Sequence, residues 1–442
     1  MTQRGAQMPA MQVPEYPALA SNVELIGEMQ ETGFKERQWL VRRGDRYLQL
    51  TELLYRVAEQ ADGKSTHEEM AEGVTRSTDW LVSAENVEQL LRSRLMPLGI
   101  VASAQATIPD EVLAAERAPS PLRVNGRARL LGPNAIDPIT KVLQILFAPF
   151  VLVPALLAVA FAHGWLYLVH GLGGAMRDVL YSPALIFAVL GVLFIAGIFH
   201  EFGHAAALRY GGGRARGMGF GFYLVYPALY TDTTENYRLG RWARVRTDLG
   251  GFYFHLIFAT GIVALYLLTG WEFLLVTVLL INVGIVYQCM PFVRFDGYWA
   301  LADLTGIPDF FSQMGAFLRS LVPIRGWKGP RLPNLKPWVK GVFAAYMIIT
   351  VPVLSLLLLR LITRLPVIAT IAWYSLLNQA AGFSRALDSG DFLGMAASFG
   401  QTLILGLQML GIAYLLYSLG RTLTGAIWKR IAAPRQPEGE SP

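Results

Sequence analysis

The stretch that decides the fold covers residues 179–206 and reads VLYSPALIFAVLGVLFIAGIFHEFGHAA. Its first 22 residues carry no charge, and about 20 mostly apolar residues are enough for a helix to cross a bilayer. The run ends in two histidines and a glutamate, which are costly at membrane depth and indicate a function. The stretch therefore predicts a membrane-spanning helix that carries a functional site at one end.

The composition of the whole chain agrees with a membrane protein. The 442 residues are 53% hydrophobic and 16% charged, whereas about 25% of a soluble globular chain is charged. This excludes a disordered protein, a simple soluble enzyme and a nucleic-acid binder that uses a basic surface. The single cysteine, Cys289, excludes a disulfide framework and a metal site built from several thiolates.

Seven windows of the chain contain no Asp, Glu, Lys or Arg. They cover residues 142–176, 179–200, 249–271, 273–293, 341–359, 365–384 and 392–420. We interpret six of them as membrane spans. The exception is 365–384, whose polar residues are compatible with a re-entrant or interfacial segment. The predicted fold class is therefore a mainly α, polytopic membrane protein with about six spans and a small N-terminal α+β domain.

The positive charges set the expected orientation. Seven Lys and Arg residues lie in 209–248, seven in 294–340 and four in 421–442, whereas the loops between these segments are poor in them. With six spans, all three basic segments and both termini fall on the cytoplasmic side of the inner (plasma) membrane. No cleavable signal peptide is expected, because the first 140 residues contain no long apolar run.

The N-terminal part is predicted to be a flexible arm (1–34), a small domain (35–105) and a linker (106–140). The domain pattern predicts a β-hairpin around Gly44-Asp45, three helices and a short returning strand. The strands are expected at 38–43, 46–50 and 98–101, and the helices over 52–61, from the capping-box pattern at 65–68, and over 84–95. The linker contains five prolines.

This order of elements resembles the winged-helix elements that bind leader peptides in pathways for ribosomally made, modified peptides. The resemblance implies a peptide partner that adds as a strand to the edge of the hairpin. A regulatory or docking domain for another partner is the alternative. A nucleic-acid partner is not expected, because residues 1–140 hold 15 Lys and Arg against 19 Asp and Glu.

The motif His200-Glu201-Phe202-Gly203-His204 has the spacing of a metal site. Residues four apart on an α-helix lie on the same face, so the two imidazoles can reach one Zn²⁺. Glu201 can act as general base for the attacking water. Polar residues that only meet lipid headgroups would explain one such group better than three at this spacing.

A third ligand is expected from the segment that follows the window 273–293. Asp296 is the main candidate, because the spans that precede it and His204 both run toward the cytoplasm. Pro291 frees backbone groups there, and Gly297 would permit a sharp turn. Asp232 is the alternative third ligand, with a turn aspartate as its simpler explanation. Cys289 is expected to pack rather than to ligate.

At these residues the chain resembles the site-2 protease family of intramembrane zinc metallopeptidases. The resemblance covers residues 140–310 and is carried by HEFGH at 200–204, PFVRFDGYWALAD at 291–303 and Gly250-Gly251. The DGYW form is most similar to the bacterial branch of peptide zinc metalloproteases associated with peptide maturation and export. The resemblance implies that His200, His204 and Asp296 bind zinc and that Glu201 is the catalytic acid and base.

The chain also departs from that family. Asn residues thought to hold the substrate backbone are replaced by Gln288 and Met290, and His255 stands where the third span often carries Asn. Gln288, His255 and Tyr298 are the residues expected to bind substrate. A hydrogen-bonded histidine within the helix bundle is the alternative for His255.

Two further segments have a predicted structure. Residues 217–231 are rich in glycine and aromatic residues and have β character, so a hairpin or extended edge there can pair with a substrate strand. A structural loop that dips into the membrane is the alternative. Residues 309–340 alternate aromatic and basic residues, which indicates an interfacial segment.

The sequence therefore predicts a zinc metalloprotease of the membrane that acts on a peptide or a membrane protein, with a peptide-export machinery as a further partner. Its rivals are a peptide-binding or export partner that keeps the zinc site without hydrolysis, and a signalling protease that cuts a transmembrane regulator. The expected parts after the linker are a catalytic core (141–310), an interfacial cytoplasmic loop (311–340), C-terminal spans (341–420) and a basic tail (421–442).

Overall fold

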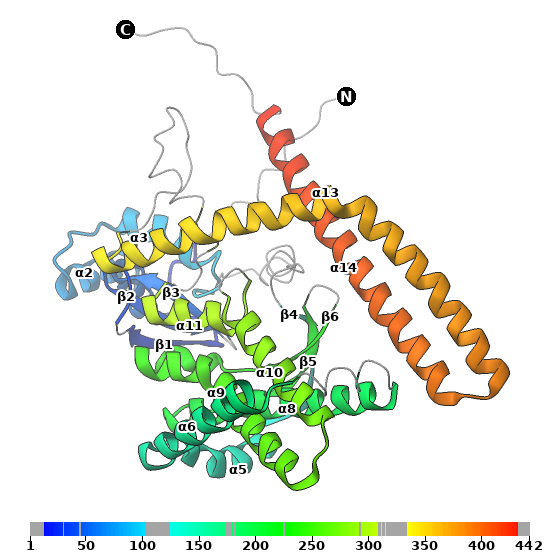
Figure 1. Cartoon of the computed structure of the whole chain (residues 1–442). Helices are drawn as coiled ribbons and strands as arrows, with labels where there is room; N and C mark the ends of the chain where they lie inside the picture. The colour runs from blue at the N-terminus through cyan, green and yellow to red at the C-terminus, as the bar shows by residue number, and fades with distance from the viewer. Residues whose placement is uncertain are drawn as a thin grey trace.

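The structure is a computed structural model of the chain. It describes residues 13–29, 31–43, 46–102, 124–172, 179, 183–223, 226–290, 293–307, 311, 314 and 334–431. Three parts can be followed in Figure 1: an N-terminal α+β domain, a helical core with a second small sheet, and a long pair of C-terminal helices. Most of the predicted interfacial loop, 311–340, lies outside the described residues.

The N-terminal domain is built on a three-stranded antiparallel sheet. Its strands are β1 (Val23–Glu28), β2 (Gln38–Arg43) and β3 (Arg46–Thr51), in the order β1-β2-β3. The predicted hairpin is confirmed, since β2 pairs with β3 from Gln38↔Thr51 to Arg43↔Arg46. The prediction of an arm over 1–34 is wrong for its later part, because β1 completes the sheet. Since β1 pairs with β2 across residues 29–37, periodicity within 23–28 alone did not reveal the pairing.

Three short helices follow the sheet, as predicted. They are α1 (Glu52–Glu59), α2 (His67–Ser77) and α3 (Ala84–Leu90), and a π-helical turn, η1 (Leu91–Leu95), extends α3. The capping box of α2 joins Thr66 and Glu69, one residue later than the pattern indicated. The predicted returning strand at 98–101 is reduced to a single bridge, Leu19↔Val101.

The predicted linker, 106–140, is wrong over its second half. Residues of this segment form β4 (Val124–Leu131) and the start of α5 (Pro133–Leu143). The strand β4 pairs with β5 (Met218–Tyr223), and β5 pairs with β6 (Tyr226–Thr231). The hairpin predicted for 217–231 is thereby confirmed. Prolines suggested a linker, but Pro133 is at the first position of α5, where the missing N–H costs nothing.

The apolar helices of the core and the C-terminal pair come next. They are α6 (Pro149–Gly164) with its extension η3 (Trp165–His170), α8 (Pro183–Tyr210), α9 (Arg241–Thr269), α10 (Phe273–Cys289), α13 (Pro337–Ser389) and α14 (Phe392–Ile431). Within the described ranges, five helices are long and apolar enough to cross a membrane, and α10 is a shorter apolar helix. These helices are compatible with insertion into a membrane.

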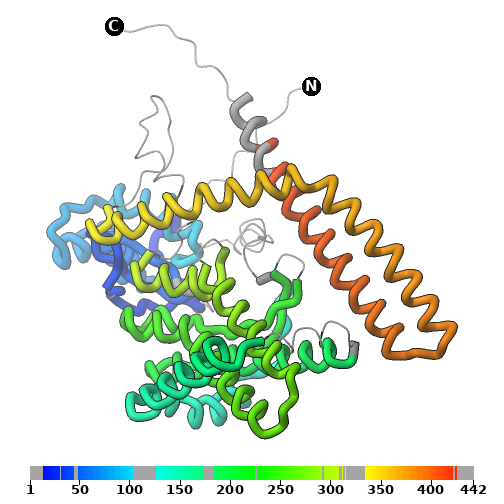
Figure 2. Tube along the Cα trace, in the orientation of Figure 1, coloured from blue at the N-terminus to red at the C-terminus, as the bar shows by residue number. Residues whose placement is uncertain are grey.

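The predicted windows 341–359 and 365–384 belong to one helix, α13, rather than to two segments. Arg360 and Arg364 separate the windows by charge, but a charged residue does not end a helix. The 53 residues of α13 amount to about 80 Å of helix, more than twice the ~30 Å hydrocarbon core of a bilayer. Figure 2 shows how α13 leaves the N-terminal domain and then turns to run beside α14.

Two glycines let α8 and α9 approach each other closely. A Cβ atom on Gly203 would lie 2.3 Å from the carbonyl oxygen of Gly250, and one on Gly250 would lie 2.5 Å from the carbonyl oxygen of Gly203. Neither position can carry a larger side chain without moving a helix backbone. This contact brings the middle of α9 against the His200–His204 turn of α8.

We predict that Gly250→Val destabilises the core, because the added methyl groups have no space between α8 and α9. Overpacking of this kind costs about 1–3 kcal/mol. The matched control is Gly261→Val on the same helix, since a Cβ there meets no atom within 4 Å. Thermal unfolding in detergent should show a lower midpoint for Gly250→Val only, and equal midpoints would contradict the packing described.

Candidate metal centre

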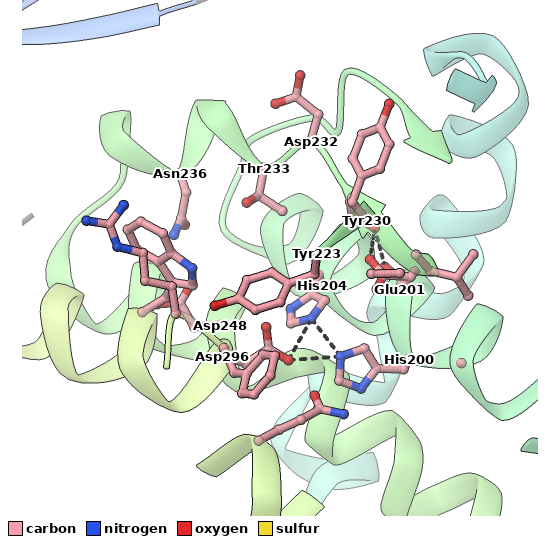
Figure 3. A pocket seen from close by; sticks show the side chains of 18 of the residues that line it. His200, Glu201, His204, Tyr223, Tyr230, Asp232, Thr233, Asn236, Asp248 and Asp296 are labelled. Atoms are coloured by element: carbon pink, nitrogen blue, oxygen red, sulfur yellow. Dashed lines mark hydrogen bonds and ion pairs between the residues drawn. The ribbon is translucent and has the colours of Figure 1, made fainter. Parts of the chain in front are cut away.

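Three ligand atoms from two helices converge at one point of the core. His200 and His204 lie one turn apart on α8, and Asp296 is the first residue of α11 (Asp296–Thr305). The His200 and His204 Nε2 atoms are 3.0 Å apart. The Asp296 Oδ2 atom lies 2.9 Å from the His200 Nε2 and 3.4 Å from the His204 Nε2. Figure 3 shows the triangle that these atoms form.

This group can hold a metal ion. Ligands about 2.0–2.1 Å from a tetrahedral Zn²⁺ are about 3.3 Å from one another, and the three observed separations lie close to that value. Both histidines are buried, with 5% and 8% exposure, and both line a cavity of the core. Three electron-rich atoms at this spacing repel one another unless a cation or protons lie between them, and the donor set fits zinc.

The other nitrogen of each imidazole has a partner of its own. The His204 Nδ1 atom lies 2.8 Å from the carbonyl oxygen of Thr247, to which it can only donate. The His200 Nδ1 atom lies 3.1 Å from the Nδ1 of His255. When Nδ1 carries the proton and donates it, Nε2 keeps its lone pair. A metal that binds through Nε2 requires this tautomer.

A glycine keeps the space between the imidazoles open. A Cβ atom on Gly251 would lie 2.4 Å from the His200 Nε2 and 2.6 Å from the His204 Nε2. Any side chain at this position of α9 would therefore occupy the place where the ligand atoms meet. Gly251 therefore leaves room for an ion between the two imidazoles.

The carboxyl group of Asp296 is held in its charged form. Burial alone would raise its pKa, but the His204 and His200 imidazoles outweigh this and keep the pKa of Asp296 well below its usual range. A cation in place of the imidazole protons would meet an anionic oxygen and two nitrogen lone pairs, which is a suitable donor set for a divalent metal.

The helix α11 is anchored so that Asp296 faces the histidines. A Cβ on Gly297 would lie 2.5 Å from the carbonyl oxygen of Cys289, so this glycine serves a close approach of α11 to α10 and not the predicted sharp turn. The Arg244 Nε donates to the Asp303 Oδ1 at 3.2 Å, which ties α9 to α11. Asn236 donates to the other carboxylate oxygen of Asp303 at 3.1 Å. Pro291 lies outside the described residues.

Glu201 lies on the wall of the same cavity, which has a volume of about 600 Å³. The Thr231 Oγ1, at the end of β6, lies 2.7 Å from the Glu201 Oε2 and 3.1 Å from the Glu201 carbonyl oxygen. Its single proton can be donated to either oxygen, and the charged carboxylate is the stronger acceptor. Figure 3 shows Glu201 beside β6 and next to the ligand triangle.

The remaining predicted residues have different positions. Asp232 lines the cavity, but its Oδ1 accepts a hydrogen bond from the Thr234 amide at 3.0 Å, and it lies outside the ligand group, which disfavours it as the third ligand. Cys289 is exposed and also lies outside that group. Gln288 lines the cavity.

Tyr298 and His255 differ in their position relative to the cavity. Tyr298 has 0% exposure and packs against α13, among residues such as Phe343, and it is not one of the residues that line the cavity, which disfavours the predicted contact with substrate. Its place, two positions after Asp296, turns it to the far side of α11. His255 lines the cavity, but its clearest role is to hydrogen-bond to His200, which orients that imidazole.

Some residues of the site were not found from the sequence. Thr231, the carbonyl oxygen of Thr247 and Asp303 support the ligands or Glu201 from other elements. Threonine, aspartate and backbone carbonyls are common everywhere, so no local pattern distinguishes these three. Gly251 had a signal, since Gly250-Gly251 was recognised, although its role in the site was not.

No protein-family model, curated protein or solved structure matches this chain. The chemistry of the site therefore rests on its residues and geometry.

We predict that Asp296→Ala purifies with less than one tenth of the wild-type zinc, because two imidazoles alone bind zinc weakly. Removing one of three ligands costs several kcal/mol, or roughly 100-fold or more in affinity. Asp232→Ala is the matched control, since Asp232 lies in the same cavity but outside the ligand group. Metal analysis of the purified proteins tests this, and equal loss in both variants would contradict the assignment.

A second prediction concerns Gly251. We expect Gly251→Ala to lose zinc although all three ligands remain, because its methyl group would occupy the meeting point of the imidazoles. Gly261→Ala on the same helix should bind zinc as the wild type does. Normal zinc content in Gly251→Ala would show that the ion lies elsewhere.

Proposed function

We propose that this protein is a membrane-embedded zinc metallopeptidase that hydrolyses a peptide bond in a peptide or membrane-protein substrate. The observation that carries the proposal is the meeting of His200, His204 and Asp296 in a cavity that also holds Glu201. The resemblance of HEFGH and PFVRFDGYWALAD to the site-2 protease family supports the same reaction. The apolar helices support a place in a membrane. The distribution of Lys and Arg supports the inner membrane, with both termini in the cytoplasm.

Bound zinc supplies Lewis acidity, which makes water more acidic and polarises a carbonyl group. Glu201 takes the proton when the water oxygen bonds to the carbonyl carbon of the substrate. It then gives that proton to the amide nitrogen as the carbon–nitrogen bond breaks, and the products are a carboxylic acid and an amine. Glu201 is regenerated, so no other reactant is needed.

The strand β6 offers a place for an extended substrate. Among the described strands it pairs with β5 alone, and its residues Ala228 to Thr231 line the cavity. A peptide that adds to this edge would expose its carbonyl groups, which a helical substrate keeps in its own hydrogen bonds. Gln288, which also lines the cavity, is the side-chain amide proposed to hold the substrate backbone.

The N-terminal domain is proposed to recognise the substrate. Its hairpin and three helices are compatible with the winged-helix plan, in which a leader peptide adds as a strand to the sheet. Peptide maturation or export, with an export machinery as partner, is the corresponding process. In the alternative proposal, the protein is a signalling protease that cuts a transmembrane regulator, and this domain only covers the site.

A non-hydrolytic peptide-binding or export partner is the second candidate. The observation that favours it is the presence of Gln288 and Met290 at positions where the related proteases carry Asn. Such a protein would bind zinc and peptide but release the peptide uncut.

We predict that Glu201→Gln abolishes hydrolysis while leaving zinc bound. General base catalysis contributes about 100-fold or more to the rate, and the amide cannot take a proton. The full-length protein in detergent is incubated with a proteome-derived peptide mixture, and new peptide termini are counted by mass spectrometry. Wild-type protein that binds one zinc ion but produces no new termini would support the non-hydrolytic candidate.

We further predict that Thr231→Val lowers kcat about tenfold, because a hydrogen bond to a charged group is lost. Thr231→Ser keeps the hydroxyl group and should restore most of the rate. Zinc content should be the same in both variants, since Thr231 contacts Glu201 and none of the three ligands. Equal rates for the valine and serine variants would exclude a role of the hydroxyl.

A further inference from the structure

A short segment of the N-terminal domain contacts α9 and α11, two of the three helices that build the metal centre. Residues 31–35 lead from β1 toward β2, and they lie against the first residue of α9 and the last residues of α11. Figure 1 shows the N-terminal sheet beside α11 and the start of α13. The two helix ends meet the same five residues, which are not themselves part of the site.

At α9 the segment supplies a cap that the helix lacks. The N-cap residue of α9, Gly240, has no side chain with which to accept a hydrogen bond. The Arg241 amide instead donates to the Glu31 Oε2 at 2.8 Å, and the Arg241 guanidinium donates to the Glu31 carbonyl oxygen at 2.6 Å. A carboxylate at a helix N-terminus pairs with a free N–H group and with the positive end of the helix dipole.

The backbone of Glu31 indicates that this contact is held in place. Its φ angle is +58°, and it is the only described residue other than glycine with a positive φ. Such a conformation is unfavourable for a residue with a Cβ and persists where surrounding contacts impose it.

The same segment also packs against the C-terminal end of α11. A Cβ on Gly33 would lie 2.2 Å from the carbonyl oxygen of Thr305, and one on Gly306 would lie 2.6 Å from the Gly33 amide nitrogen. The Gly33 amide donates to the Gly306 carbonyl oxygen at 3.4 Å, a long hydrogen bond at the C-cap of α11. The start of α13 closes the contact, since the Lys336 amide donates to the Gly33 carbonyl oxygen at 2.9 Å.

One capped helix carries a ligand, and the other carries the hydrogen-bond partner of a second ligand. The helix α9 carries the Thr247 carbonyl oxygen that accepts from His204, and α11 begins with Asp296. The Arg244–Asp303 pair joins the two helices between the caps and the ligands. Less than four turns of helix separate either capped end from a ligand or from its hydrogen-bond partner.

We propose that residues 31–35 are a positioning element of the metal centre, so that the N-terminal domain controls the affinity of the site for zinc. The inference rests on the metal centre of the proposed function but not on hydrolysis. By linkage, a contact that strengthens zinc binding is itself strengthened when zinc binds. Events in the N-terminal domain that shift Glu31 or Gly33 would then change the occupancy of the site.

The first test uses the unaltered protein. Hydrogen exchange of the full chain in detergent is measured with excess zinc and after zinc is removed by a chelator. We expect zinc to slow exchange at the Gly33, Lys35 and Lys336 amides by about threefold or more, because a coupling of ~0.7 kcal/mol corresponds to that factor. The amides of α2, whose buried residues pack in the core of the N-terminal domain, should not change. Equal exchange at 33–36 with and without zinc would overturn the proposal.

The second test changes the cap itself. Zinc affinity is measured by competition with a fluorescent chelator for Glu31→Ala, Glu31→Gln and the exposed control Glu36→Ala. We expect Glu31→Ala to weaken zinc binding about two- to tenfold, the range set by loss of a helix cap, whereas Glu31→Gln keeps an acceptor oxygen and recovers most of it. Wild-type affinity in Glu31→Ala would contradict the proposal, and no zinc binding by the wild type would instead contradict the proposed function.

Discussion

Mutual repulsion among three electron-rich atoms is the constraint on which the rest of the core depends. The Nε2 atoms of His200 and His204 and a carboxylate oxygen of Asp296 lie within 3.4 Å of one another in a buried place. Such an arrangement is stable only with a cation or protons between the atoms. The helix packing makes this convergence possible, because Gly203 and Gly250 bring α8 against α9, and Gly251 leaves the central space free.

The supports of this site come from parts of the chain that are distant in sequence. His255 and the Thr247 carbonyl oxygen on α9 fix the two imidazoles. Asp303 ties α11 to α9 through Arg244, and Thr231 on β6 holds Glu201. The site is therefore a property of the assembled core and not of the HEFGH motif alone, and the N-terminal domain reaches it through the ends of α9 and α11.

Local sequence patterns were sufficient to predict the features that depend on helix or strand periodicity within a short segment. The i and i+4 spacing of His200 and His204, the hairpin at 38–50 and the β character of 217–231 all lie within one or two elements. Asp296 required only the added argument that two spans run in the same direction. The strands β1 and β4 were missed because each pairs with a strand outside its own segment. The unbroken helix α13 was missed because charged residues indicate where a chain leaves the membrane, but they do not indicate where a helix ends. Tyr298 was predicted to bind substrate because it lies near Asp296 in the DGYW motif. Its position on α11, however, directs it into the packing against α13.

X-ray absorption at the zinc edge of the purified full-length protein measures the ligand set directly. We expect one zinc ion per chain with only nitrogen and oxygen neighbours, at about 2.0–2.2 Å, and with the outer-shell scattering of two imidazoles. A sulfur neighbour at about 2.3 Å, a single imidazole, or protein that binds no zinc would contradict this expectation.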